Sequence, residues 1–167
     1  MKTKFLLLFV ITTVFYSCRN NSNKQIERDE QVLEFRSTLQ KSDTTMMLKL
    51  CDDAMENLKN KKIDEVLAAL HEYSDSTKEV RPLSESTAKK YRRMFELFPV
   101  LQYERIYYSF QLEGCNDVKY RVTFATAEAA KTDKAPQTAF MFNPVKVDGT
   151  WKLCVKTAGQ ETDPYRR

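Results

Sequence analysis

The spacing of apolar residues changes once along this chain, from a helical period to a strand period. Near residues 47–58 the apolar side chains recur at three- and four-residue steps, as in Met47, Cys51 and Leu58, which indicates one face of a helix. From residue 106 to residue 124 they alternate with polar residues, which indicates strands with one buried face. Helices followed by an antiparallel meander predict an α+β domain, with the helices packed on one face of a curved sheet.

Four helical segments are expected before the strands. The first runs from about residue 26 to residue 40, and Ser42-Asp43 offers an N-cap for the second. Three polar residues at 60–62 separate the second helix from a third that starts at Ile63. Ser84 is expected to cap the fourth helix, whose apolar stripe consists of Ala88, Tyr91, Phe95 and Phe98. Residues 71–83 show no clear period and are expected to form a loop with, at most, a short edge strand.

The second half of the chain predicts a meander. The alternation in residues 106–112 and 118–124 predicts a hairpin, with Ile106 and Tyr108 on the buried face. Residues 140–147 predict a third strand, bent at Asn143-Pro144. A turn at Asp148-Gly149 leads into a last strand, which buries Trp151, Leu153 and Val155.

Two stretches of residues resemble the NTF2-like (SnoaL-like) superfamily. One is the helix-turn-helix at 58–67, and the other is the closing hairpin Val145-Lys146-Val147-Asp148-Gly149-Thr150-Trp151-Lys152-Leu153. The resemblance covers about Asp43 to Thr157 and implies an NTF2-like, cystatin-like cone whose concave sheet face holds a pocket. It implies no shared chemistry, and the helix before residue 43 departs from the family pattern.

The first 18 residues are built like a bacterial lipoprotein signal. Lys2 and Lys4 lie near the start of the chain, residues 5–15 form an apolar run, and Ser17 precedes Cys18. The run is shorter than the about 20 residues that cross a bilayer, which predicts a processing signal. Phe15 and Tyr16 depart from the usual lipobox, and such relaxed boxes resemble those of Bacteroidota lipoproteins. The alternative is an ordinary signal peptide with a chance cysteine.

If Cys18 is the lipidation site, the chain is expected to consist of five segments. The expected parts are a signal peptide (1–17), a polar tether (18–25), an additional helix (26–42), an NTF2-like domain (43–157) and a polar tail (158–167). The first acidic residue after the cysteine is Glu27. By resemblance to lipoprotein sorting rules, this predicts an outer-membrane protein that faces the periplasm and is anchored by its lipid.

Composition excludes several functional classes. The net charge of +4 falls when the two signal lysines are removed, and this near-balanced surface does not suggest nucleic acid. Cys115 and Cys154 are a candidate disulfide, whereas Cys51 fits the apolar face of a helix. The chain has no CxxC motif and no Cys/His cluster, so neither a metal site nor another cofactor is expected.

Catalytic candidates are few. His71 is the only histidine, the three glycines form no phosphate-binding loop, and adjacent carboxylates such as Asp52-Asp53 point apart on a helix. Some NTF2-like enzymes combine a tyrosine hydroxyl with a carboxylate. The tyrosines expected on elements that line the cone are Tyr91, Tyr103, Tyr107, Tyr108 and Tyr120. Aromatic residues at strand spacing also fit a filled core, and no residue is assigned as catalytic.

Two functional classes remain. The first is a non-catalytic binding or structural module of the envelope, whose partners would be a small apolar ligand, a peptide or another envelope protein. The second is a small-molecule isomerase or dehydratase that uses a pocket tyrosine and a carboxylate. A dry aromatic pocket favours the first class, and a buried acid beside a pocket tyrosine favours the second.

Overall fold

The computed structural model describes residues 23–125 and 135–155, which belong to two units. The first unit contains a helix over residues 23–38, and the second unit begins at Leu39. The described part of this helix thus includes residues predicted as a tether, and it ends two residues before the predicted end at about residue 40. Cys18, the signal segment and the tail 158–167 lie outside the described residues.

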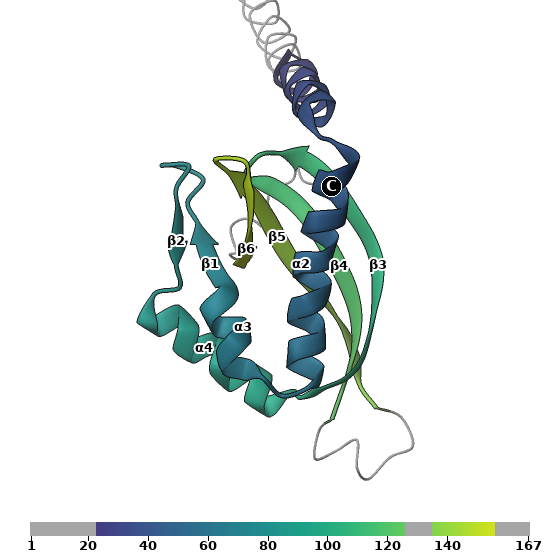
Figure 1. The fold of residues 1–167 in the computed structure, drawn as a ribbon, viewed down its shortest axis with the longest axis vertical. Coiled ribbons are helices and arrows are strands. Elements are labelled where there is room, and N and C mark those ends of the chain that lie inside the picture. Colours follow the sequence, from purple (N-terminus) through teal and green to yellow (C-terminus); the bar gives the residue numbers. More distant parts are fainter. Residues whose placement is uncertain (1–22, 126–134, 156–167) are drawn as a thin grey trace, which may run out of the picture. The chain divides into compact units, whose positions relative to one another are not determined.

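The second unit consists of three helices and six strands (Figure 1). The helices are α2 (Lys41–Lys59), α3 (Ile63–Ala69) and α4 (Glu85–Leu97). The strands are β1 (Leu70–Tyr73), β2 (Val80–Pro82), β3 (Val100–Leu112), β4 (Cys115–Phe124), β5 (Gln137–Val147) and β6 (Thr150–Val155).

The six strands form one mixed sheet in the order β2-β1-β6-β5-β4-β3. All neighbours are antiparallel except β1 and β6, which are parallel. Helix α2 contacts β3, β5 and β6, and Figure 1 shows β3 and β4 curving around it. The predicted α+β class, with helices on one face of a curved sheet, is therefore confirmed.

Helix α2 is held by the cap at its start and by the stripe that it buries. Gln40, rather than Ser42-Asp43, is the N-cap residue, and its backbone N–H donates to Asp43 Oδ2 at 2.9 Å. This closes a capping box. The buried stripe matches the predicted face and consists of Met47, Cys51, Ala54, Met55 and Leu58. In α4, Ser84 accepts a hydrogen bond from the backbone N–H of Thr87, as predicted.

The segment predicted as a loop contains two short strands. Strand β1 follows α3 directly and pairs with β2, with Glu72 opposite Arg81. On its other side, β1 pairs in parallel with β6, where Leu70 lies opposite Leu153. This second pairing joins residues far apart in the sequence, which explains why local periodicity does not show it.

Strand β3 departs from the predicted alternation. Its pairing with β4 has register shifts between Arg105 and Tyr107 and again after Phe110. A bulge moves the following residue to the other face. Ile106 and Tyr108, predicted to be buried, are 39% and 46% exposed.

Strand β5 runs without a break through the predicted bend at Asn143-Pro144, and its pairing with β6 is continuous from Phe142 to Val147. Asn143 is fully buried, and its side-chain oxygen accepts from the backbone N–H of Asn116 at 2.8 Å. Its amide group donates to the carbonyl of Gly114 at 3.0 Å. These side-chain bonds extend the β4–β5 contact beyond the paired segment.

The last hairpin matches the prediction. Asp148 and Gly149 both have positive φ, at 48° and 76°, as a two-residue type I′ turn requires. Trp151, Leu153 and Val155 are buried on the face predicted for them. The indole N–H of Trp151 donates to Asp43 Oδ1 at 3.1 Å, which ties the hairpin to the start of α2.

Candidate functional site

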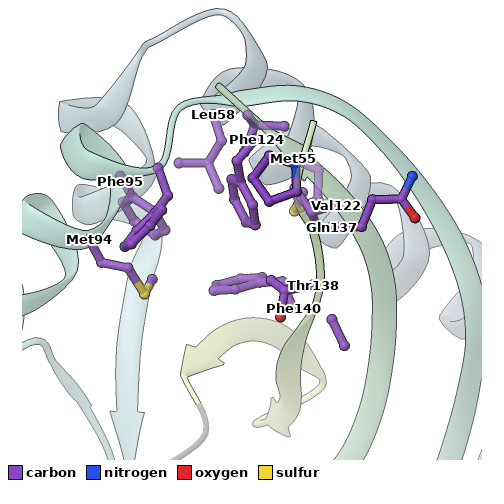
Figure 2. A pocket seen from close by; sticks show the side chains of 13 residues that line it. Met55, Leu58, Met94, Phe95, Val122, Phe124, Gln137, Thr138 and Phe140 are labelled. Carbon is purple, nitrogen blue, oxygen red and sulfur yellow. The ribbon is translucent and has the colours of Figure 1, made fainter. Parts of the chain in front are cut away.

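A cavity of about 570 Å³ lies between the end of α2, the end of α4 and the sheet (Figure 2). This volume falls within the range of small-molecule sites. Its lining comes from every layer of the fold and consists of Met55, Leu58, Met94, Phe95, Phe98, Val100, Val122, Phe124, Pro136, Gln137, Thr138, Ala139 and Phe140.

The walls of the cavity are mainly aromatic and aliphatic. Phe140 meets Phe95 edge-on, with 6.1 Å between the ring centroids, and meets Phe142 at 4.9 Å. At the end of α4, the ring of Phe98 lies 5.9 Å from that of Phe124. Edge-to-face contacts of this kind favour a definite ring orientation. Each ring of the wall is therefore kept in place by the ring beside it, even where it faces open space.

Polar groups are scarce in this lining. Among the described residues that form it, none carries a charge, and only Gln137 and Thr138 have polar side chains beyond the methionine sulfurs. Figure 2 shows the Gln137 amide directed away from the cluster of rings, and its Nε2 donates to Thr123 Oγ1 at 3.4 Å. Thr138 lies opposite Val122 in the β4–β5 ladder and so shares the cavity face.

None of the five tyrosines predicted as pocket-lining is among the residues that line this cavity. Two of them meet carboxylates of α2 instead. The Tyr120 hydroxyl donates to Asp52 Oδ1 at 2.6 Å, and the Tyr103 hydroxyl donates to Glu56 Oε2 at 3.0 Å. Arg105 Nη1 lies 2.6 Å from Asp52 Oδ2. These bonds fasten β3 and β4 to α2.

The pKa shifts of Tyr103, Tyr120 and Glu56 disfavour proton transfer by these groups. Burial and the Glu56 contact raise the pKa of Tyr103 to about 12, while the hydrogen bonds from Tyr103 and Asn60 lower the pKa of Glu56. Burial and the Asp52 contact also raise the pKa of Tyr120. A general acid or base works best with a pKa near the working pH, and these shifts move the groups away from neutrality.

The other three tyrosines lie at separate places. The Tyr107 hydroxyl donates to Asp117 Oδ2 at 3.4 Å, and burial is the main cause that raises the pKa of Tyr107. Tyr108 is 46% exposed, and the ring of Tyr91 lies 5.8 Å from that of Phe95. Tyr91 therefore stands one ring behind the cavity wall.

Three cysteines lie in the described chain. Cys115 and Cys154, the candidate disulfide, are both buried, and the structure does not join them. Burial raises the pKa of the Cys154 thiol to about 12 and that of Cys51 above its ordinary value. The Cys51 and Cys154 thiols are therefore poor nucleophiles at neutral pH, and they act as small buried side chains.

The described residues contain neither a candidate metal site nor a candidate membrane-spanning helix. Within 23–125 and 135–155, no three His, Cys, Asp or Glu side chains are grouped so that they could hold a metal ion. No helix in these same ranges is both long and apolar enough to span a membrane.

Comparison with known proteins finds a similar solved structure. No protein-family model matches the chain, and no curated protein matches it. The chain is similar to an NTF-2-like protein of unknown function from Shewanella oneidensis MR-1, with 15% identity and a TM-score of 0.43. The match covers 66% of this chain and 93% of the other.

The sequence contained part of the signal for this cavity. Phe95 and Phe98 belong to the predicted stripe of α4, and Val122 and Phe124 belong to the predicted buried face of β4. Thr138 was missed because its strand begins three residues before the predicted one. The packing between helices and strands decides whether such residues fill a core or line a cavity. Sequence periodicity contains no information on that packing.

Proposed function

We propose that this protein is a lipid-anchored, non-catalytic module of the bacterial envelope that holds a small apolar ligand in the cavity. The observation that carries the binding proposal is the cavity itself, whose described lining is mainly apolar and carries no charge. Sites that take up small ligands commonly combine an apolar wall with few polar groups. The signal-like start of the chain supports the anchoring proposal.

An isomerase or dehydratase is the alternative, and one observation favours it: tyrosine–carboxylate pairs do occur, at Tyr120–Asp52 and Tyr103–Glu56. These four residues lie outside the cavity lining, however, and Asp52 is also held by Arg105. A catalytic group must reach its substrate. We therefore infer that the pairs stabilise the wall behind the cavity.

Filling the cavity is expected to abolish ligand uptake. Thr138 faces the cavity from an exposed position on β5, so Thr138→Trp places a large ring in that space with little disturbance of the core. The neutral dye N-phenyl-1-naphthylamine, which fluoresces in apolar surroundings, should bind the wild type and bind Thr138→Trp at least tenfold more weakly. Fluorescence titration measures both affinities.

The matched control is Arg121→Trp on the opposite face of the sheet. Arg121 is exposed and pairs with Glu104 at 2.8 Å, so its loss costs little stability. This variant should bind the dye as the wild type does. Equal binding by all three proteins would place the dye elsewhere and contradict the cavity proposal.

Acylation at Cys18 is the prediction that tests the anchoring. Cells that are fed labelled fatty acid should incorporate the label into the wild type and not into Cys18→Ala, because the thiol is the proposed attachment point. Cys51→Ala is the control, since that thiol is buried in α2 and should not affect labelling. Equal labelling of wild type and Cys18→Ala would end the lipoprotein proposal.

A further inference from the structure

The residues that line the cavity differ in their exposure to solvent. Met55 and Val122 are completely buried, and Phe95 is 6% exposed. Thr138 is exposed and Phe98 is 44% exposed, although both line the same space. A ligand in this cavity therefore meets buried apolar side chains and also lies beside residues that are open to solvent.

Thr138 supplies the polar side chain on the cavity face. Its partner in the ladder is Val122, a buried lining residue, and side chains of a directly paired position project to the same side of a sheet. Figure 2 places Thr138 beside the Phe140 ring, with Gln137 directed away. Within the described chain, no hydrogen bond joins the Thr138 hydroxyl to another residue, so it is available to a ligand both as donor and as acceptor.

The described lining has no counter-charge for a charged ligand group. An ion buried without a partner pays a desolvation penalty far larger than that of an alcohol or ketone. The aromatic edges and methionine side chains of the wall contribute dispersion contacts and no full charge. The described part of the lining therefore offers no partner for a carboxylate or an amine, and it favours a neutral molecule.

We propose that the ligand is a neutral amphiphile, with an apolar body against Met55, Phe95 and Val122 and a single alcohol, ketone or amide group at the Thr138 hydroxyl. The inference rests on the proposed binding function and adds the ligand's charge and orientation. If each non-hydrogen atom occupies about the volume of a liquid water molecule, the cavity holds roughly 20 such atoms.

The test is a competition series in which only the head group varies. Decanol, decan-2-one, decanoate, decylamine and decane are each used to displace N-phenyl-1-naphthylamine from the wild type at neutral pH. Decanol and decan-2-one should displace the dye at concentrations at least tenfold lower than decanoate and decylamine. Equal or better displacement by either charged compound would overturn the proposed ligand class.

The position of the head group is tested by Thr138→Val, which removes the hydroxyl and keeps the shape. Its affinity for decanol should fall roughly fivefold, the usual size of one neutral hydrogen bond, while its affinity for decane stays unchanged. Thr150→Val makes the same change at an exposed position of β6 outside the cavity lining and should leave decanol binding unaltered. Unchanged decanol affinity in Thr138→Val would overturn the assignment of Thr138.

The same titrations separate this inference from the function on which it rests. Failure of the dye to bind the wild type would contradict the binding function itself, and the inference would fall with it. Dye binding that is lost in Thr138→Trp, combined with no preference for neutral head groups, would keep the binding function and overturn only the ligand class.

Discussion

Replacing Trp151 with alanine is expected to lower the free energy of unfolding by about 3–5 kcal/mol, the usual cost of removing a buried large aromatic side chain. Trp151 is 7% exposed, and its ring lies 5.8 Å from that of Phe110. Lys146 Nζ lies 5.9 Å from the indole centroid. The substitution therefore opens a void between α2 and the β5–β6 hairpin, and urea denaturation measures the loss.

Trp151→Phe is the matched variant for this position. It keeps an aromatic ring but loses the N–H that donates to Asp43, so it should lose less stability than the alanine variant. A loss below about 1 kcal/mol for Trp151→Ala would contradict the burial of this strand face.

Asp43→Asn is expected to destabilise the protein by about 3 kcal/mol at neutral pH, because it removes one partner of a buried ion pair. Asp43 is 4% exposed, and Lys146 Nζ lies 2.7 Å from its Oδ1. The backbone N–H of Gln40 and the indole of Trp151 donate to the same carboxylate. A single side chain thus joins the start of α2 to the closing hairpin.

The same site predicts a pH dependence. The Lys146 contact, followed by the bond from Gln40, lowers the pKa of Asp43. The unfolded chain then binds more protons than the folded chain in the acid range, so stability rises with pH there. The contribution of Asp43 is fully present above its ordinary pKa of about 4 and is lost as the pH falls through the lowered folded value.

Urea denaturation of both proteins from pH 7 to pH 3 tests this sign. The stability gap between wild type and Asp43→Asn should be largest at neutral pH and should shrink as the pH falls below about 4. Asp53→Asn is the control, since its pair with Lys49 is exposed and should contribute under about 1 kcal/mol. A gap that does not change with pH would contradict the ionised pair.

The parts of the fold that were predicted correctly are those with a local pattern. Helix α2 shows its face within 12 residues, from Met47 to Leu58, and the turn at Asp148-Gly149 has residues that tolerate positive φ. Strand β1 has no such pattern. Its first two residues, Leu70 and His71, pair with β6, which lies more than 70 residues later in the chain. Sequence periodicity contains no signal for this contact.

Strand β3 shows why alternation alone misplaced several side chains. It is an edge strand with β4 as its neighbour, and bulges interrupt its pairing. The period-two rule assumes an unbroken pleat, so Ile106 and Tyr108 were placed in the core although both are exposed. Tyr103, which lies before the central bulge, does face α2 and reaches Glu56.

The candidate site depends on tertiary packing. The sequence predicts that the site is aromatic, but it does not identify the residues that line it. An aromatic concave face was expected, and the cavity has one, but its rings are phenylalanines from α4, β4 and β5. Tyrosines are predicted from the sequence as lining residues because a tyrosine hydroxyl can polarise a substrate carbonyl. In the structure, the Tyr103 and Tyr120 hydroxyls are directed to the carboxylates of α2, and phenylalanine and methionine surround the open space.

The most direct test of the binding proposal uses the methionines as internal reporters. Met55 and Met94 line the cavity, whereas Met47 is fully buried elsewhere in α2 and Met46 is 50% exposed. With ¹³C-methyl-labelled methionine, titration of the purified protein with N-phenyl-1-naphthylamine should shift the NMR signals of Met55 and Met94 and leave those of Met46 and Met47 in place. Shifts confined to Met46, or no shift at Met55 and Met94 at saturating dye, would contradict ligand binding in the cavity.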